Sequence, residues 1–349
     1  MKKTMEIAGH PIGPGHPPFV IAELSANHNG RLDRALETMR AAKDAGADAV
    51  KLQTYTADTM TIEHGGPGFT IEGGLWNGRT LHDLYREAHT PWEWHKALFE
   101  YGRELGLIVF SSPFDATAID LLESLDAPAY KIASFELVDL PLIRKCAALG
   151  RPMIMSTGIA DLGEISEAVA AAQAAGARDI ALLHCTSGYP TPPEEADLRT
   201  LPHLAEAFGL VTGLSDHTPG IGTAVAGVAL GASIIEKHIT LSRADGGPDS
   251  AFSMEPDEFR ALCENAERAW RSLGTVRYDK SNAEKGNAQF RRSLYIVEDM
   301  EVGETLSEAN FRAIRPGFGL PPKYYDILLG KTVNQDVLRG TPMSWDLLG

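Results

Sequence analysis

The chain has 349 residues, 44% of them hydrophobic and 23% charged, a composition typical of globular proteins. This length exceeds one average domain and matches an α/β barrel with a small appendage. The formal net charge is −15 and no basic stripe offsets it, which argues against nucleic acid as a partner. An anionic substrate must therefore be met by a local cluster of cations.

Cysteine content and hydropathy indicate where the protein resides. Cys146, Cys185 and Cys263 are scattered and lack metal-type spacing, which favours a reducing cytosol over a disulfide framework. No apolar run is long enough to cross a bilayer, and the Gly- and Pro-rich stretch 9–18 lacks the apolar core of a signal peptide. We therefore expect a cytoplasmic protein that binds neither nucleic acid nor membranes.

Short β-rich runs alternate with Ala- and Glu-rich helical stretches over most of the chain. Glycines at 46, 106 and 176 follow three of these helices, where a left-handed cap is favoured. Eight units of this kind predict a closed parallel barrel, the (β/α)8 TIM barrel. The β-rich runs begin near residues 19–23, 49–53, 107–110, 129–132, 152–155, 180–183, 211–214 and 233–236.

Two segments depart from this alternation. The stretch 59–90 is too long for one connection, and its glycines and Trp76 predict a loop that covers a substrate, with a disordered insertion as the alternative. After a last helix near 256–273, a polar stretch precedes short strands and Pro- and Gly-rich turns. We predict a catalytic barrel over 1–278, a linker over 279–291 and a small domain over 292–349.

Cationic and hydroxyl side chains recur at the predicted strand ends. Lysine supplies charge and hydroxyls supply directed donors, so this set predicts a pocket for a small phosphate or carboxylate. The alternative is that each lysine pairs with an inward carboxylate such as Glu23, Glu136 or Glu236. Glu23, Ser25 and Asn27 alternate and are expected to share an inward face. The cationic and hydroxyl set comprises Lys51, Lys131, Ser112, Ser134, Ser156, Ser187 and Ser215.

Two histidines, His217 and His238, end two consecutive strand-like runs. The carboxyl ends of barrel strands are where such folds place their chemistry, so two imidazoles there are able to share one metal ion. With few protein ligands, the metal keeps positions open for water and substrate and acts as a Lewis acid on a carbonyl oxygen. For either histidine alone, a hydrogen-bonded core imidazole is the alternative.

Longer motifs carry a resemblance. The segments 21–30 (IAELSANHNG), 50–55 (VKLQTY), 130–136 (YKIASFE), 213–218 (GLSDHT) and 235–238 (IEKH) resemble the sialic acid synthase family. Three further stretches, 89–95, 246–253 and 315–325, resemble its pseudaminic acid synthase branch. The tail from about Arg292 resembles the family's antifreeze-like SAF domain. The resemblance extends over almost the whole chain.

The resemblance implies condensation of phosphoenolpyruvate with a free amino-sugar aldehyde, giving a nine-carbon 2-keto acid and phosphate. Manganese or magnesium is then expected on His217 and His238, and Glu23 is the catalytic carboxylate. The phosphoenolpyruvate site is implied at Lys51, Lys131, Ser112, Ser134, Ser156, Ser187 and Ser215, and the sugar side at Glu136, Tyr189 and Asp249.

Arg315 matches an arginine that the family's small domain inserts into the barrel of a neighbouring subunit, which implies a domain-swapped homodimer. Spacing alone favours a surface arginine that orders its own Pro-Gly turn.

The branch implies 2,4-diacetamido-2,4,6-trideoxy-L-altrose as the sugar, and hence a more apolar lining. Trp92, Trp94 and Phe252 are candidates for that lining, although each is equally suited to core packing. Legionaminic or N-acetylneuraminic acid synthesis is the second choice within the class. A metal-dependent aldolase that uses pyruvate, and a non-catalytic carbohydrate-binding protein, are the alternatives from other classes.

Overall fold

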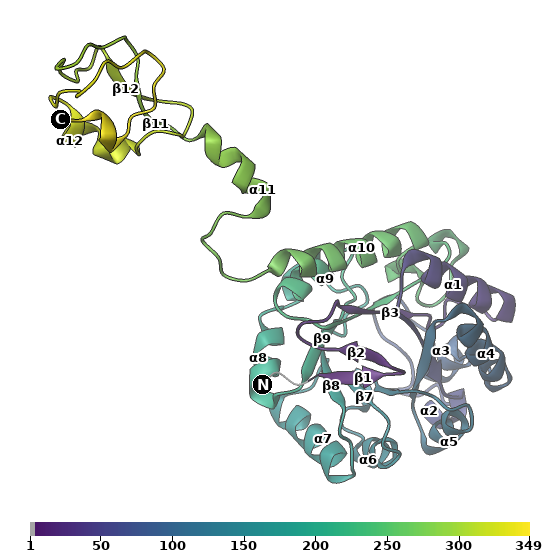
Figure 1. Cartoon of the computed structure of the whole chain (residues 1–349). Helices are drawn as coiled ribbons and strands as arrows, with labels where there is room; N and C mark the ends of the chain where they lie inside the picture. The colour runs from purple at the N-terminus through teal and green to yellow at the C-terminus, as the bar shows by residue number, and fades with distance from the viewer. Residues whose placement is uncertain (1–3) are drawn as a thin grey trace. The chain divides into compact units, whose positions relative to one another are not determined.

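A computed structural model describes residues 4–349 of the chain. It contains two compact units that divide between Gly274 and Thr275, and each is described here by itself (Figure 1).

The first unit is a closed barrel of eight parallel strands, which confirms the predicted TIM barrel. Around the barrel the order is β10, β3, β4, β5, β6, β7, β8 and β9, so each strand pairs with its neighbours in sequence and β10 closes onto β3. The strands are β3 (Phe19–Glu23), β4 (Ala49–Thr54), β5 (Ile108–Pro113), β6 (Tyr130–Ile132), β7 (Met153–Ser156), β8 (Ile180–Cys185), β9 (Val211–Ser215) and β10 (Ile234–His238).

Helices surround the barrel (Figure 1). Gly46 and Gly106 adopt the left-handed conformation that ends α1 and α4, as predicted, and Gly176 follows one residue after the cap of α7. The helices are α1 (Leu32–Ala45), α2 (Ala57–Met60), α3 (Leu81–Ala88), α4 (His95–Leu105), α5 (Ala116–Ser124), α6 (Leu140–Ala148), α7 (Leu162–Ala174), α8 (Thr200–Phe208), α9 (Gly222–Ala229) and α10 (Pro256–Leu273).

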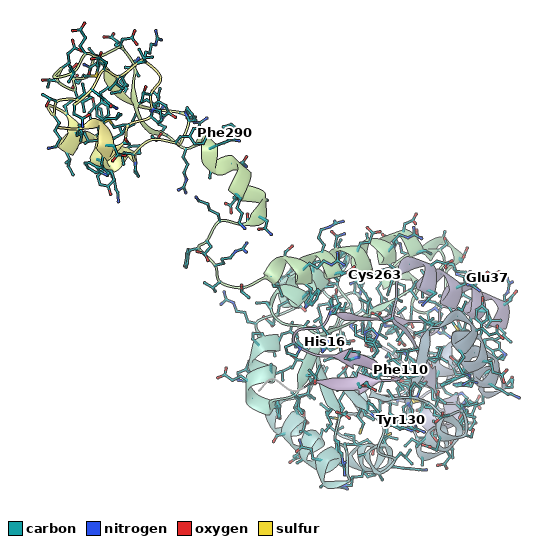
Figure 2. All side chains as sticks on the ribbon, in the orientation of Figure 1. His16, Glu37, Phe110, Tyr130, Cys263 and Phe290 are labelled. Atoms are coloured by element: carbon teal, nitrogen blue, oxygen red, sulfur yellow. The ribbon has the colours of Figure 1, made fainter. Side chains whose placement is uncertain are left out.

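The barrel has an apolar layer on each side of its wall. Outward side chains such as Tyr130 pack against the helices, and inward ones such as Phe110 fill the amino-terminal half of the lumen; both are labelled in Figure 2. Toward the carboxyl ends of the strands the inward positions become polar, beginning with Glu23, Lys51 and Ser112. The apolar half stabilises the fold and leaves the polar edge for chemistry.

An N-terminal hairpin closes the floor of the barrel, a feature that our sequence analysis missed. Strands β1 (Met5–Ile7) and β2 (His10–Ile12) pair antiparallel through a two-residue turn at Ala8 and Gly9, both with positive φ. Met5, Ile7 and Ile12 are buried and belong to the lumen core. Figure 1 shows the two strands lying across the barrel.

The excursion over residues 59–90 is folded, unlike the disordered insertion that we considered as its alternative. It contains α3 and an antiparallel hairpin over 69–81, closed by a bridge between Thr70 and Thr80. Just beyond the excursion, a buried chain of hydrogen bonds ties the start of α4 to the barrel: His95 Nε2 lies 2.8 Å from Thr54 Oγ1, which lies 2.7 Å from Ser111 Oγ.

The second unit is a small domain of short strands and turns. Strands β11 (Ser293–Ile296) and β12 (Phe311–Ile314) pair antiparallel, and the short helices are α11 (Asn282–Lys285) and α12 (Tyr325–Leu328). Leu294, Phe311 and Leu328 lie in its separate hydrophobic core. Over residues 4–349, none of the helices combines the length and the apolar character that crossing a bilayer requires.

Candidate active site

Because three neighbouring strands pair in register, polar side chains from all three form one row at the carboxyl edge of the lumen. Glu23 on β3 is paired in register with His238 on β10 and with Lys51 on β4. In a parallel sheet, residues paired in register point to the same face. The row therefore brings an imidazole, a carboxylate and an ammonium group side by side.

Two lysines and two glutamates form a buried ionic cluster beside this row. Lys51 Nζ lies 2.9 Å from Glu23 Oε2 and 3.4 Å from Glu236 Oε1, and Lys131 Nζ lies 2.8 Å from Glu236 Oε1. Ser215 Oγ donates to Glu236 Oε1 at 3.0 Å. Both lysines therefore pair with buried carboxylates. In the sequence analysis, this pairing was the alternative to binding a small anion.

Glu236 is the centre of this cluster, and sequence reasoning did not select it as a site residue. Its position two residues before His238 on one strand was the available signal, because such residues share a face. Burial raises its pKa, but Lys131 and Lys51 outweigh that effect and hold the pKa well below its usual value. Glu236 is therefore ionised.

Glu23 behaves in the opposite way. Burial raises its pKa to about 7, and the nearby charge of Glu236 adds to this, although Lys51 opposes the rise. Burial also lowers the pKa of Lys51, but Glu23 and Glu236 outweigh it and the pKa is raised. Burial lowers the pKa of Lys131, although Glu236 opposes this. Near neutral pH the cluster therefore has the Lys51 ammonium group, the Glu236 carboxylate that pairs with Lys131, and the Glu23 carboxyl group in exchange with its ionised form.

Two hydroxyls of the same edge have unused hydrogen-bonding capacity. Ser112 and Ser156 are buried, and their Oγ atoms have no hydrogen-bond partner among residues 4–349. A buried polar atom without a partner is costly unless a ligand or water satisfies it. These hydroxyls, next to ammonium groups, suit a small anion.

A second set of donors surrounds Gly158, in the loop after β7. Gly158 N–H donates to Ser134 Oγ at 3.1 Å, and a Cβ at position 158 would lie 2.7 Å from Ser134 Oγ and would clash with Ser187 Oγ. The hydroxyls of two predicted serines therefore pack against the Gly158 backbone at distances that only glycine allows. Sequence reasoning missed Gly158.

The two imidazoles lie together, with ring centroids 5.4 Å apart. His217 Nδ1 donates to Thr186 O at 3.2 Å, which leaves Nε2 with its lone pair. His238 Nδ1 is buried and has no hydrogen-bond partner among residues 4–349, and burial holds its pKa well below the usual value. A neutral imidazole with a free lone pair is a metal ligand. Within the described residues, no three His, Cys, Asp or Glu side chains form a ligand set, so a metal on the two imidazoles would need further ligands from outside the protein.

A buried ion pair fixes the backbone next to both histidines. Lys237 Nζ donates to Asp216 Oδ2 at 2.7 Å and to Thr218 O at 2.5 Å, and Thr218 N–H donates to Asp216 Oδ1 at 2.9 Å. Asp216 and Lys237 each precede one of the histidines and are almost fully buried. These bonds join the ends of β9 and β10.

Aromatic side chains cover one side of the imidazoles. The Tyr189 ring lies 4.5 Å from His217, and the Phe252 ring lies 4.9 Å from His238 and 5.2 Å from Tyr189. Of the three candidates for an apolar lining, only Phe252 contacts the imidazoles in this way. Trp92 donates to Tyr55 O, and Trp94 packs edge-on against His28 in the core.

Asp249 lies in the segment after β10 and is buried against the loop that follows β3, the first strand of the barrel. Its Oδ2 accepts from Ser25 Oγ at 2.5 Å and from Ala26 N–H at 3.4 Å, while burial raises its pKa. The expectation that Glu23, Ser25 and Asn27 share an inward face was wrong beyond Glu23. The strand ends there, Ser25 has φ 44°, and Asn27 instead bonds Ile239 O.

The remaining predicted residues are Glu136 and Arg315. Burial raises the pKa of Glu136 to about 7, and Lys131 and Lys51 oppose this. Arg315 belongs to the second unit, where it is exposed on the loop after β12.

An α/β barrel with lysines, glutamates, hydroxyls and paired imidazoles at the carboxyl ends of its strands has the arrangement of a TIM-barrel enzyme. Comparison identifies the family: residues 38–278 match the NeuB family and residues 291–349 match the SAF domain. The chain belongs to the NeuB family, and the resemblance found in its motifs is confirmed.

Relatives with assigned names extend this finding. The chain is 45% identical over 332 residues to a pseudaminic acid synthase of Helicobacter pylori, covering 95% of this chain and 97% of that one. It is 36% identical over 322 residues to an N,N'-diacetyllegionaminic acid synthase of Campylobacter jejuni, covering 91% and 96%. A solved N-acetylneuraminic acid synthetase of Leptospira borgpetersenii, in complex with citrate, has a TM-score of 0.74 at 30% identity and covers 83% of this chain and 97% of its own.

Replacing Lys237 by Met should lower the free energy of unfolding by about 3–5 kcal/mol, because Asp216 would remain buried without its counter-ion. Urea denaturation measures the change. The matched control is Lys145→Met, whose pair with Asp120 is exposed and should contribute less than about 1 kcal/mol. Equal losses in the two variants would show that the buried pair contributes no more than a surface one.

Proposed function

We propose that the chain condenses phosphoenolpyruvate with 2,4-diacetamido-2,4,6-trideoxy-L-altrose to give pseudaminic acid and inorganic phosphate. This makes it a transferase that forms a carbon–carbon bond. The observation that carries the proposal is 44–45% identity to three pseudaminic acid synthases over at least 91% of the chain. Legionaminic acid synthesis is the second candidate, since synthases of that acid are 34–36% identical to the chain.

His217 and His238 are the proposed ligands of a divalent metal, Mn²⁺ or Mg²⁺. Burial lowers the pKa of the His238 imidazole and so favours its neutral form, whereas the effect of burial at His217 is outweighed by Cys185, which raises the pKa of His217. An ion held by the two imidazoles would complete its coordination with oxygen atoms of substrate and water. When bound, the metal supplies Lewis-acid polarisation of the sugar aldehyde.

We propose that phosphoenolpyruvate binds at the ionic cluster of two lysines and two glutamates. With Glu236 ionised and Glu23 protonated, Lys51 and Lys131 leave one net positive charge in a buried site, which favours an anion. Ser112 and Ser156 offer unpartnered hydroxyls beside it. The Ser134 and Ser187 hydroxyls beside Gly158 suit phosphate oxygens, because directed donors in a dry site stabilise charge strongly.

In the proposed reaction, C3 of phosphoenolpyruvate bonds to the aldehyde carbon, and the aldehyde oxygen takes a proton to become a hydroxyl. Water adds at C2 and loses a proton, and the tetrahedral intermediate breaks its C2–O bond to release phosphate. Glu23 is proposed to accept or return these protons, because a carboxyl group with a pKa near 7 exchanges a proton readily at neutral pH.

Phosphate release tests the function. The enzyme with Mn²⁺ and phosphoenolpyruvate should release phosphate fastest with the altrose-type precursor, more slowly with the legionaminic- and mannose-type sugars, and not with sugar alone. Preference for another sugar would reassign the product. Condensation with pyruvate, without phosphate release, would show a pyruvate aldolase instead.

Gly158→Ala should raise the KM for phosphoenolpyruvate at least about tenfold, because the methyl group would push the Ser134 and Ser187 hydroxyls out of the positions in which they are proposed to donate to phosphate, a loss of about 1.5–3 kcal/mol. Steady-state kinetics at saturating sugar measure it. Gly222→Ala is the matched control, since a Cβ there meets nothing within 4 Å. An unchanged KM would place the phosphate elsewhere.

The pH dependence of kcat should show a rising limb near pH 7. Below that pH Glu23 is protonated and cannot accept a proton, and above it the carboxylate forms. Protons also compete with metal for His217, so the profile is repeated at tenfold higher Mn²⁺. A limb that moves to lower pH with added metal would assign the titration to metal binding and contradict the role of Glu23.

We also propose that the second unit of one chain docks on the barrel of another in a homodimer and inserts Arg315 there. Charge supports this pairing. Acidic residues exceed basic ones by 15 in the whole chain, and the entire excess lies in residues 1–274, because residues 275–349 contain ten of each. The second unit has no net charge and is therefore not repelled by the acidic barrel of another chain, as a second acidic surface would be.

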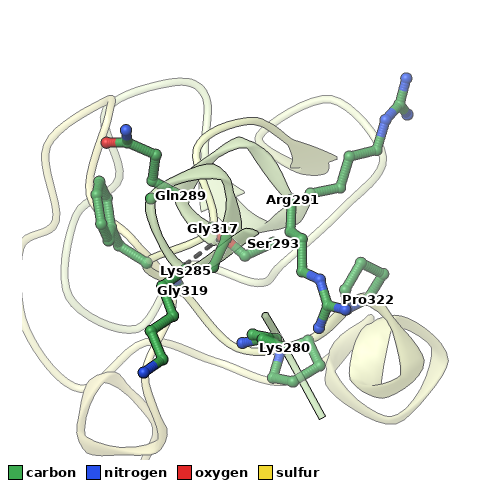
Figure 3. Close-up of a pocket in the computed structure, with 13 residues that line it drawn as sticks. Lys280, Lys285, Gln289, Arg291, Ser293, Gly317, Gly319 and Pro322 are labelled. Carbon is green, nitrogen blue, oxygen red and sulfur yellow. Dashed lines mark hydrogen bonds between the residues drawn. The ribbon is translucent and has the colours of Figure 1, made fainter. Parts of the chain in front are cut away.

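Each unit also exposes side chains suited to this contact. At the barrel mouth Phe135 and Ile159 are 57% and 71% exposed, and they follow the hydrogen-bonded residues Ser134 and Gly158. In the second unit the exposed Phe318 lines a cavity of about 710 Å³ (Figure 3). Four cations line the same cavity: Lys280, Lys285, Arg291 and Arg292.

Mixing two inactive variants tests the exchange. Arg315→Ala and Glu23→Ala should each abolish most activity, whereas a mixture after subunit exchange should regain up to about one quarter, because one site in a mixed dimer is intact. Size-exclusion chromatography with tagged chains verifies exchange. No recovery in verified mixed dimers would contradict insertion in trans.

We also propose a cellular compartment for the protein and boundaries for its domains. Cys146, Cys185 and Cys263 are free thiols, which supports a reducing compartment and hence the cytoplasm. We retain 1–278, 279–291 and 292–349 as the barrel, the linker and the small domain.

A further inference from the structure

We infer that Trp76 is a specificity-determining residue, which places an indole ring over the sugar side of the site and selects sugars with an apolar 6-position. The inference rests on the proposed function, because it concerns the amino sugar of that reaction. It assigns a role to the excursion between β4 and α4.

A hydrogen-bonded β-hairpin positions the indole ring of Trp76. In the hairpin over 69–81, Ile71 N–H donates to Arg79 O at 2.9 Å and Leu81 N–H donates to Phe69 O at 2.8 Å. Residues 72–75, 77 and 78 near its tip are exposed, whereas Trp76 is half-buried. The tip therefore directs its one aromatic side chain back toward the protein.

Trp76 meets the barrel beside two residues that the sequence assigned to the sugar. Its Nε1–H donates to Pro248 O at 2.9 Å, and Pro248 immediately precedes Asp249. Its ring centroid lies 5.8 Å from that of Tyr189, with 51° between the ring planes. Segments far apart in sequence thus converge where Tyr189 and Asp249 are expected to contact the sugar.

The indole extends a continuous aromatic wall. From Trp76 the wall passes to Tyr189, whose ring lies against both His217 and Phe252, and Phe252 lies against His238; the centroids of these pairs are 4.5–5.8 Å apart. Trp76 is the member farthest from the imidazoles along this series. A sugar whose aldehyde lies near the imidazoles would extend its far carbons along the wall.

The chemistry of the wall favours methyl groups. Aromatic faces bind C–H surfaces, and a hydroxyl held against them loses hydrogen bonds with water without replacement. A 6-deoxy sugar presents a methyl group there, whereas its 6-hydroxy counterpart presents a hydroxymethyl group. Hydrophobic pockets reject an added hydroxyl by at most about 100-fold, so we expect selectivity of about 10- to 100-fold.

Three variants test the inference. Trp76→Ala removes the ring, Trp76→Phe keeps an aromatic face but loses the bond to Pro248 O, and Trp92→Phe alters a tryptophan whose Nε1–H donates to Tyr55 O. For each, kcat/KM is measured with the altrose-type precursor and with its 6-hydroxy counterpart, together with the KM for phosphoenolpyruvate and the thermal midpoint.

We expect Trp76→Ala to reduce the ratio of the two kcat/KM values at least about fivefold, with the phosphoenolpyruvate KM and thermal midpoint unchanged. Trp76→Phe and Trp92→Phe should keep the ratio within about twofold. An unchanged ratio in Trp76→Ala, while the wild type still prefers the 6-deoxy sugar, overturns the inference alone. If the wild type turns over neither sugar, the proposed function fails and the inference fails with it.

Discussion

The structure depends on two carboxylates and two ammonium groups that share one buried end of the barrel lumen. A single charge at that depth would cost several kcal/mol, whereas a mutually paired set with hydrogen bonds is tolerated. The pairing requires β10, β3 and β4 to hold their register, since a slip of one residue would turn Glu236, Glu23 and Lys51 to the outer face. The same register places His238 beside Glu23, so the ionic cluster and the imidazole pair are set together.

The two ends of the barrel lumen have different compositions: the amino-terminal half is apolar and stabilises the fold, and the carboxyl edge is polar and suited to chemistry. Inward residues such as Phe19 and Ile154 form an apolar core in the amino-terminal half, and polar groups occupy the carboxyl edge. Because the apolar half supplies packing, the polar edge tolerates hydroxyls with unused hydrogen-bonding capacity. The loops beyond the edge carry Gly158 with its two serines and the aromatic wall, the groups that we propose bind the two substrates.

The sequence predicts the repeated strand–helix units of the barrel. It does not predict which residues far apart in the chain come into contact. Alternating β-rich and helical runs specify eight strands, and strand ends locate both histidines, because these signals are local. The central place of Glu236 depends on which strands become neighbours across the lumen. Trp94 and Trp76 look equivalent in sequence, yet one packs in the core and the other reaches the site through a hairpin. The strands β1 and β2 have three residues each, too few for a periodic signal.

The N-terminal hairpin has a consequence for the order of events. Because Met5, Ile7 and Ile12 seal the amino-terminal end, every small molecule enters and leaves the lumen through one opening. In the proposed reaction both substrates would therefore pass the same carboxyl-terminal mouth, and a donor seated on the ionic cluster would have to arrive before an acceptor that covers it.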